Sequence, residues 1–290
     1  MKAGWLIYSE PDAVKNASFI DWLKAEAALA GLSLELMFAE RFAFGVTDNK
    51  LSLYYDLKEM RLPHFAVVRT IQPLLSRQLE KMGLKLFNSS SVSAVANDKA
   101  RTHQLLAEAG IPMMDTLFIR PSFFQTQSMP FDFPLVAKLA SGRGGQQVYL
   151  VKTEKELQNA LSTHPEQDWI LQKMAPDAGK DVRVFVVGNK IAGAVLRSSS
   201  NDFRANYSLG GHAELYHLKH EQTALVERII SHFDIGMAGI DFLLNEKGAF
   251  IFNEMEDVVG SRTLSATSDI NIARLYMEHI AAKLKKPESD

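Results

Sequence analysis

The sequence contains no cysteine in its 290 residues. Disulfides, thiolate zinc sites, iron–sulfur clusters and a thiol nucleophile are therefore all excluded. No apolar run approaches the roughly 20 residues of a membrane-spanning helix, and the few apolar residues before Ser9 are too few for a signal peptide. These absences predict a protein of the reducing cytoplasm that has no membrane partner.

Neither sign of charge is in excess. The chain has 32 basic and 34 acidic residues, a formal charge of -2 at pH 7. A broad cationic surface for nucleic acid is therefore not expected. The motifs G-x-x-x-x-G-K-[ST], H-E-x-x-H and G-x-S-x-G are also missing, which argues against a P-loop, a zincin or a nucleophile-elbow hydrolase.

The first ninety residues alternate between strand and helix patterns, which predicts a mostly parallel sheet covered on both faces. The expected elements lie at residues 4–8, 14–29, 32–38, 65–68, 73–82 and 84–87. This part has no G-x-G-x-x-G turn, so a dinucleotide role is not favoured. The stretch from Arg41 to Asp56 fits either a hairpin or an irregular insertion.

Beyond a boundary expected near residue 92, antiparallel pairs predominate. Two strands, 134–140 and 147–151, flank the glycine-rich SGRGGQ. Two hairpins follow, separated by a helix, and a last helix closes the chain. These elements are expected at 182–196, 222–233, 239–256 and 270–285.

Lys138 interrupts the apolar run PLVAKLA, and a buried ammonium without an anion is costly. The loop that follows contains Gly142, Gly144 and Gly145, which let the backbone approach an anion closely, and Arg143 adds positive charge. The combination indicates a bound polyphosphate. The alternative is an edge-strand lysine whose amine reaches solvent, beside an ordinary glycine turn.

Asp241 lies inside the apolar strand AGIDFLL, and Glu254 and Glu256 end its partner AFIFNEMED. Regular pairing would put Asp241 opposite Phe252, with Glu254 as its diagonal neighbour. Three carboxylates on a half-buried face repel, and Mg²⁺ or Mn²⁺ would resolve the conflict. The competing interpretation is a set of ion pairs with arginines, namely Arg183, Arg197 or Arg262.

The 17-residue segment SSSNDFRANYSLGGHAE is rich in Ser, Asn and Gly and contains Arg204 and Asn206. Segments of this length and composition are typical of active-site lids, although a solvated connection has the same composition. His212, His217 and His220 match no familiar zinc spacing, so we expect surface histidines.

Taken in order, these motifs resemble the ATP-grasp superfamily, and within it the RimK-type carboxylate–amine ligases that add glutamate to a carboxylate. The resemblance covers about residue 88 to the end. It is carried by NDKARTHQLLAEAGIP, FPLVAKLASGRGGQQV, WILQKM, DVRVFVVGNKIAGAVLRS, NDFRAN, AGIDFL and FNEMEDVVGSR.

The resemblance implies a mixed α/β (α+β) fold, the ATP-grasp fold, with a Rossmann-like pre-ATP-grasp domain at the N-terminus. The implied domains are the pre-ATP-grasp domain at 1–92, an N-terminal lobe with the glycine-rich loop at 93–172 and a C-terminal lobe with the metal-binding hairpin at 173–290.

The resemblance also implies roles for individual residues. Two lysines would contact the phosphates, Lys99 and Lys138. A flap over the phosphates would consist of Ser141, Gly142, Arg143, Gly144 and Gly145. The backbone of a hinge would bind adenine, with an aspartate nearby on the nucleotide: Gln172, Lys173, Met174 and Asp181. The γ-phosphate and the acyl intermediate would face Arg183, Arg197, Arg204 and Asn206. Two metal ions would be held by Asp241, Glu254 and Glu256.

Two departures from the family pattern limit this transfer. The hinge Gln172-Lys173-Met174 replaces a usual glutamate followed by an aromatic or aliphatic residue. The family's E-x-N is here Glu254-Met255-Glu256, followed by DVVG in place of a small-residue and proline turn. Recognition of the adenine edge and substrate identity are therefore not carried over.

The implied activity is ATP- and Mg²⁺-dependent (or Mn²⁺-dependent) ligation of a carboxylate acceptor to an amine through an acyl phosphate. The amine would be glutamate or another amino acid, and family habit suggests a homodimer or homotetramer. Two alternatives stay open: a catalytically silent ATP-binding regulatory module of the same fold, and direct phosphorylation of a hydroxyl.

Overall fold

The protein is described here from a computed structural model, which places residues 1–124, 129–145, 147–177, 179–199 and 211–285. Arg204, Asn206 and most of the expected lid lie outside these described residues. No helix in the described ranges is both long and apolar enough to cross a membrane.

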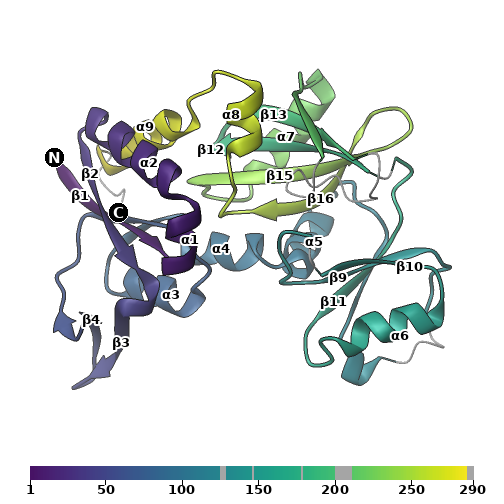
Figure 1. The fold of residues 1–290 in the computed structure, drawn as a ribbon, viewed down its shortest axis with the longest axis horizontal. Helices are drawn as coiled ribbons and strands as arrows, with labels where there is room; N and C mark the ends of the chain where they lie inside the picture. The colour runs from purple at the N-terminus through teal and green to yellow at the C-terminus, as the bar shows by residue number, and fades with distance from the viewer. Residues whose placement is uncertain (125–128, 146, 178, 200–210, 286–290) are drawn as a thin grey trace.

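The N-terminal part is a four-stranded parallel sheet of order β2-β1-β6-β7 (Figure 1). Its strands are β1 (Lys2–Tyr8), β2 (Leu32–Phe38), β6 (Phe65–Val68) and β7 (Lys85–Phe87). Its helices are α1 (Glu10–Lys15), α2 (Ala17–Leu29) and α3 (Pro73–Lys81). The single helix expected at 14–29 is thus two helices, which meet at Asn16, the C-cap of the first and the N-cap of the second.

The stretch that the sequence left open is a hairpin with a short third strand. It comprises β3 (Phe42–Thr47), β4 (Lys50–Tyr55) and β5 (Lys58–Glu59). The β3–β4 turn is formed by Asp48 and Asn49, both at positive φ (49° and 59°). Asn and Asp tolerate this conformation better than other side chains do, which favours the tight turn.

The second sheet is antiparallel, with order β10-β9-β11-β8. Its strands are β8 (Thr116–Ile119), β9 (Leu135–Leu139), β10 (Val148–Val151) and β11 (Trp169–Lys173). Helix α6 (Glu154–Ser162) packs on it through Leu157 and Leu161, with Trp169 in the same buried cluster. Thr153 caps this helix, since its hydroxyl accepts from the backbone N–H of Glu156.

The third sheet has five antiparallel strands in the order β14-β13-β12-β15-β16. The strands are β12 (Lys180–Val187), β13 (Lys190–Ser198), β14 (His212–Leu215), β15 (Met237–Leu244) and β16 (Phe250–Glu256). Helix α7 (His220–Ile230) packs on one face, where Val226 and Ile229 join Ile240 and Phe252 in a buried cluster.

The pairing within the β15–β16 hairpin differs from the expected register. The loop has five residues, 245–249, so Phe242 and not Asp241 pairs with Phe252. A bulge then makes Asn253 an extra residue in β16, and Asp241 lies directly opposite Glu254. The predicted diagonal relation was wrong because the five-residue loop and the bulge each shift the pairing by one residue.

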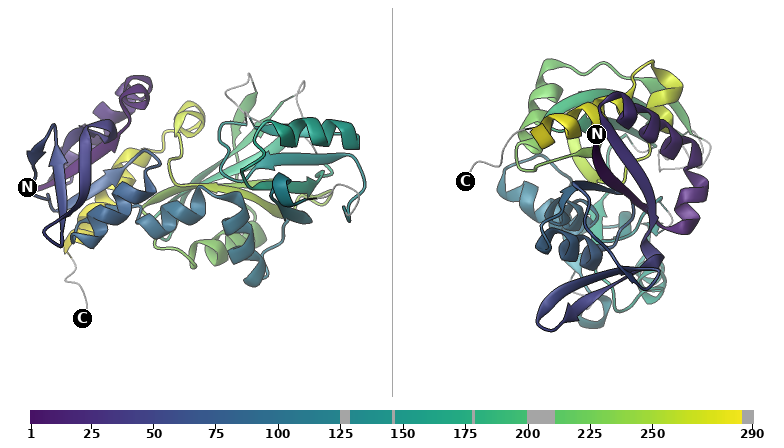
Figure 2. Two further views of the ribbon diagram at one scale, coloured as in Figure 1. Left: turned by 90° about the horizontal axis from the view of Figure 1, so that it is seen from below. Right: turned by 90° about the vertical axis from the view of Figure 1, so that its left-hand side faces the viewer.

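The remaining α-helices of the described residues are α4 (Ser90–Ala96), α5 (Lys99–Glu108), α8 (Arg262–Thr267) and α9 (Ile272–Lys285). The first and second sheets lie at opposite ends of an elongated molecule, with the five-stranded sheet between them (Figures 1 and 2). Helix α9 packs against α2, so the last helix joins the core of the N-terminal sheet. The domain boundaries stay a prediction.

Candidate functional site

Lys138 is buried on β9, with 8% of its surface exposed. Its Nζ donates to two neutral oxygens, Gln172 Oε1 and Asn253 Oδ1, each at 2.9 Å. Burial lowers the pKa of Lys138 to about 8, although attraction to Glu254 offsets part of the effect. The sequence-based alternative of an amine that reaches solvent is therefore wrong, because this amine lies in the interior between two sheets.

Lys99 joins the glycine loop to the acidic hairpin. It is the first residue of α5, and its Nζ lies 3.1 Å from Glu254 Oε2 and donates to the carbonyl of Gly142 at 2.5 Å. Its backbone N–H donates to the carbonyl of Ala140, the residue after β9. The structure thus brings the two predicted lysines and Glu254 together, although they lie far apart along the chain.

The glycine loop connects β9 to β10. Gly144 and Gly145 have φ of 64° and 71°, a left-handed conformation that other residues rarely adopt. Gly142 donates its N–H to Leu139, and a side chain there would lie within 3.1 Å of the Leu139 Cβ. Ser141 and Arg143 are exposed on this loop. The glycines therefore fix the conformation of this turn, and the guanidinium of Arg143 lies at the surface.

The second charged cluster lies on the face of the five-stranded sheet. Arg197 binds Asp181 through two hydrogen bonds of 2.6 and 2.7 Å and also donates to Asp241 at 2.7 Å. Arg183 binds both oxygens of Asp241, at 2.7 and 2.6 Å. The arginine pairing that the sequence left as the competing interpretation is thus present for Asp241, with Arg183 and Arg197 as its partners.

The pKa values in this cluster follow burial and charge. Burial would raise the pKa of Asp241, but the two guanidinium groups hold it far below its usual value. Burial raises the pKa of Asp181 to about 6, against the attraction of Arg197. The pKa values of Arg183 and Arg197 are raised, since the attraction of their carboxylate partners outweighs burial. Two arginines and two aspartates therefore balance one another.

Glu254 and Glu256 are the more accessible acids, with side chains 23% and 22% exposed. Burial would raise the pKa of Glu254, but Lys99 and Lys138 carry it below its usual value. Burial raises the pKa of Glu256, with Arg183 opposing at 3.2 Å. In the described part of the chain, no three acidic or histidine side chains converge as a metal site. Among the residues that the structure places, each glutamate has one cationic partner, Lys99 for Glu254 and Arg183 for Glu256, whereas Asp241 is held by two arginines. The glutamates are therefore the better candidates for a divalent cation.

The predicted hinge residues, Gln172, Lys173 and Met174, make different contacts. The amide of Gln172 is buried and joins Lys138 to Thr116 Oγ1, to which it donates at 3.1 Å. The backbone N–H of Lys173 already donates to the carbonyl of Asp115, and its amine binds the Asp115 carboxylate at 2.7 Å. The Lys173 N–H is therefore occupied in this structure, and the adenine contact of the hinge stays a prediction.

Two residues that the sequence analysis missed support the lysine cluster. Asn253 is the bulge residue, and His103 of α5 hydrogen bonds to its carbonyl oxygen at 2.9 Å through Nε2. The spacing of the buried residues Phe250, Phe252 and Met255 indicates the bulge, because two residues separate the last pair where one separates the first. No spacing of residues in the sequence marks His103 in a comparable way.

Arg69, the residue after β6, was also missed. It is 5% exposed and donates to the carbonyls of Asp257 and Val259, the residues that follow β16, at 3.5 and 2.7 Å. Its Nε, Asp257 Oδ1 and the hydroxyl of Tyr8 are buried with no hydrogen-bond partner in the described residues. Arg69 therefore fixes the turn after the acidic strand to the N-terminal sheet.

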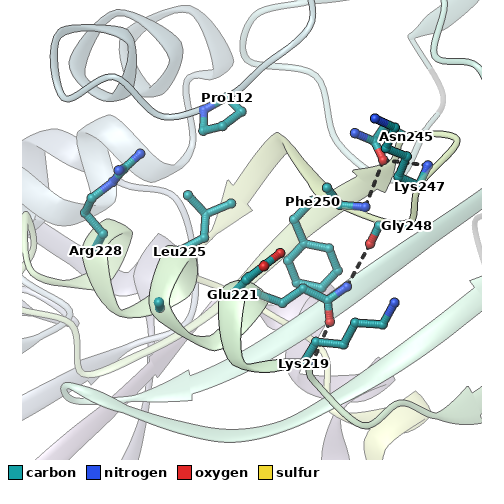
Figure 3. Close-up of a pocket in the computed structure, with 12 residues that line it drawn as sticks. Pro112, Lys219, Glu221, Leu225, Arg228, Asn245, Lys247, Gly248 and Phe250 are labelled. Atoms are coloured by element: carbon teal, nitrogen blue, oxygen red, sulfur yellow. Dashed lines mark hydrogen bonds between the residues drawn. The ribbon is translucent and has the colours of Figure 1, made fainter.

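A separate cavity of about 670 Å³ lies at the turn end of the β15–β16 hairpin, against α7 (Figure 3). Gln222 is one of its lining residues, donating to the Gly248 carbonyl and accepting from the Lys219 N–H. None of the predicted site residues lines it. The three histidines His212, His217 and His220 are exposed, as expected.

Comparison with known families decides the class of the protein. Residues 96–280 match the RimK-like ATP-grasp domain family, which is more than half of the chain. The chain belongs to the RimK-like ATP-grasp family. A probable alpha-L-glutamate ligase of Legionella pneumophila (strain Corby) is 29% identical over 283 residues, covering 92% of this chain and 93% of the relative.

Solved structures agree on the fold. A RimK domain protein from Sphaerobacter thermophilus superimposes with a TM-score of 0.74 at 18% identity, covering 96% of this chain and 99% of that one. The ATP-grasp ligase PsnB, solved with a phosphomimetic variant of a minimal precursor, Mg and ADP, gives 0.70 at 13% identity, covering 99% of both chains. The predicted family and the mixed α/β ATP-grasp fold are confirmed, and the predicted class, a ligase that forms carbon–nitrogen bonds, agrees with these comparisons.

Proposed function

We propose that this RimK-like chain is an ATP- and Mg²⁺-dependent carboxylate–amine ligase that forms an amide through an acyl phosphate. The observation that carries the proposal is the convergence of Lys99 and Lys138 with Glu254 beside the glycine loop. The name of the Legionella relative, a probable alpha-L-glutamate ligase, supports glutamate as the amine substrate.

The lysine cluster, formed by Lys99, Lys138 and Glu254, suits the phosphates of a nucleoside triphosphate. Lys99, Lys138 and Glu254 sum to one positive charge, and Lys138 has only neutral oxygens as hydrogen-bond partners in the described residues. Charge left over in a site of low exposure favours an anion such as a phosphate. The loop with Gly144 and Gly145 would cover the phosphates, and the backbone of Met174 would meet adenine.

Glu254 and Glu256 would hold Mg²⁺, with Asp241 joining them only after release from an arginine. The bound ion would neutralise phosphate charge. The predicted set of three metal ligands is thereby reduced to Glu254 and Glu256. Asp241 is left out because a carboxylate with two guanidinium partners is a poor metal ligand. Manganese would suit the same oxygen donors.

The proposed chemistry needs little covalent participation by the protein. The acceptor carboxylate attacks the γ-phosphorus and releases ADP; the amine then attacks the acyl carbon, phosphate leaves, and the amine loses a proton. Lys138 neutralises phosphate charge, while Arg183 and Arg197 would reach the acyl centre only on release from Asp241. The fixed charge of Lys138 needs no reorganisation during reaction, which makes electrostatic positioning effective.

The test is release of ADP, screened over pairs of carboxylates and amines that include glutamate and short acidic peptides. Mass spectrometry of the products then identifies any amide. We expect one amide per ADP for at least one pair. A stable phosphorylated product would instead indicate transfer to a hydroxyl, and ADP release without a new bond would contradict ligation.

The double arginine pairing of Asp241 favours a second candidate, a silent ATP-binding module of the same fold. Such a module would bind ADP with Mg²⁺ yet release none from ATP with any pair. The same screen therefore separates the two functions, provided that binding is measured alongside it.

A further inference from the structure

The surroundings of Lys138 contain a feature that charge alone does not require. Its Nζ is held by Gln172 Oε1 and Asn253 Oδ1, two amide oxygens on different sheets. No carboxylate of the described residues lies within 4 Å of this amine. A buried lysine is usually paired with an acid. Here the partners are polar but uncharged.

We propose that Gln172 and Asn253 form a neutral clamp that fixes the position of the Lys138 amine while leaving its positive charge for the nucleotide phosphates, and that His103 positions this clamp. The proposal deepens the proposed function, on which it rests for the identity of the nucleotide. It assigns a positioning role to three residues, of which only Gln172 was predicted to lie in the site, and that through its backbone.

The bulge is what places Asn253 at the lysine. In the register set by Phe242 and Phe252, regular pairing would put Asn253 opposite Asp241 and Glu254 opposite Ile240. A shift of one residue moves a side chain to the other face of a sheet. The extra residue therefore lets Asn253 reach Lys138 while Glu254 still reaches Lys99.

His103 secures the bulged carbonyl. Because a carbonyl can only accept, the Nε2 that contacts Asn253 at 2.9 Å must carry a hydrogen. The ring is fully buried, and both Phe118 and Phe252 lie edge-on to it. Burial lowers the pKa of His103, with the Asn253 contact opposing, which favours the neutral ring. A neutral donor fixes the bulge without adding charge beside Lys138.

An acid at either clamp position would change this balance. Asp has the shape of Asn, but its carboxylate would pair with Lys138 at about 3 Å and compete with phosphate for the same charge. A leucine would remove the hydrogen bond without adding charge. The pair Asn253→Asp and Asn253→Leu therefore separates electrostatic effects from loss of packing.

The experiment measures the Kd of ADP with Mg²⁺ by calorimetry, together with the thermal midpoint of the unliganded protein. The set is wild type, Asn253→Asp, Asn253→Leu, Gln172→Glu and the surface control Asn189→Asp. We expect Asn253→Asp and Gln172→Glu each to weaken ADP binding about tenfold or more with an unchanged or higher midpoint. Asn253→Leu should lower the midpoint, and Asn189→Asp should change neither quantity.

His103 is tested by rescue. His103→Leu should weaken ADP binding, and His103→Gln, whose amide N–H can donate to the same carbonyl, should restore it. Wild-type Kd values in both acidic clamp variants would overturn the clamp, and an equal loss in His103→Leu and His103→Gln would overturn the positioning role. A wild-type protein that binds no ADP would overturn the proposed function itself. If Asn253→Asp fails to fold, Gln172→Glu tests the clamp from the other sheet.

Discussion

The two charged clusters of this protein are balanced in different ways. The arginine cluster is closed: Arg183 and Arg197 face Asp181 and Asp241 through charge-assisted hydrogen bonds of 2.6–2.7 Å. The lysine cluster is open, since Lys138 has only neutral partners in the described residues. A closed cluster specifies how three strands align, whereas an open one retains charge for a ligand.

The largest expected difference between the clusters concerns stability. Asp241→Asn would leave two buried guanidinium groups short of an anion and should lower the free energy of unfolding by about 3 to 5 kcal/mol. Lys138→Met removes a buried charge that has no ionic partner and should leave the unfolding free energy unchanged or higher. Urea titration of both variants measures this. Equal losses would show that both clusters are structural.

Catalytic activity, measured as ADP release, should instead depend on the lysine cluster. Glu254→Gln removes the anion that orients Lys99 and a proposed ligand of Mg²⁺, so ADP release should fall about a hundredfold or more while the fold is kept. The control is Glu246→Gln, an exposed acid in the turn of the same hairpin. Full turnover by Glu254→Gln would remove the lysine cluster from the active site.

The open cluster should also respond to pH. Burial lowers the pKa of Lys138 to about 8 in the folded protein, so above this pH the amine loses the charge that attracts phosphate. ADP affinity should fall by up to about tenfold per pH unit above 8. Lys138→Met should bind weakly at every pH and show no such step. A flat wild-type profile from pH 7 to 10 would contradict the assignment.

Deprotonation of Lys138 should lower ADP affinity but raise the free energy of unfolding as pH increases. Between pH 8 and the ordinary value of 10.5, the unfolded chain keeps a proton that the folded chain has lost. The contribution of Lys138 to the unfolding free energy therefore rises with pH in this window. Comparing urea titrations of wild type and Lys138→Met across the window isolates this contribution.

The smallest effect is expected at Lys173, a surface counterpart of Lys138. Its amine pairs with Asp115 at 2.7 Å, but both side chains are about half exposed or more. Lys173→Met should therefore change the unfolding free energy by less than about 1 kcal/mol and leave ADP affinity near the wild-type value. A large loss of affinity would mean that this hinge side chain, and not only the hinge backbone, contacts the nucleotide.

Parts of this picture are visible in the sequence because charge is costly in an apolar run. Lys138 and Asp241 interrupt such runs, and the structure brings both into the buried region that the sequence predicts. The alternation of strands and helices before residue 88 likewise predicts the parallel sheet. These features follow from local pattern and need no knowledge of how distant segments meet.

Other parts depend on contacts that spacing does not encode. The bulge at Asn253 shifted the register, and the pairing of Asp241 with two arginines required three strands to be aligned. His103 lies in a helix that is 150 residues from its partner along the chain. Arg69, on the N-terminal sheet, binds the turn after β16 in the same long-range manner. Such residues become evident only when the sheets are placed together.

Whether the open lysine cluster binds the nucleotide is decided by calorimetric titration of the wild-type protein and Lys138→Met with ADP and Mg²⁺ at pH 7. We expect saturable binding at one site by the wild type and at least about a hundredfold weaker binding by a variant that is equally well folded. Equal affinities, or no binding by the wild type, would contradict the assignment of this cluster as the nucleotide site.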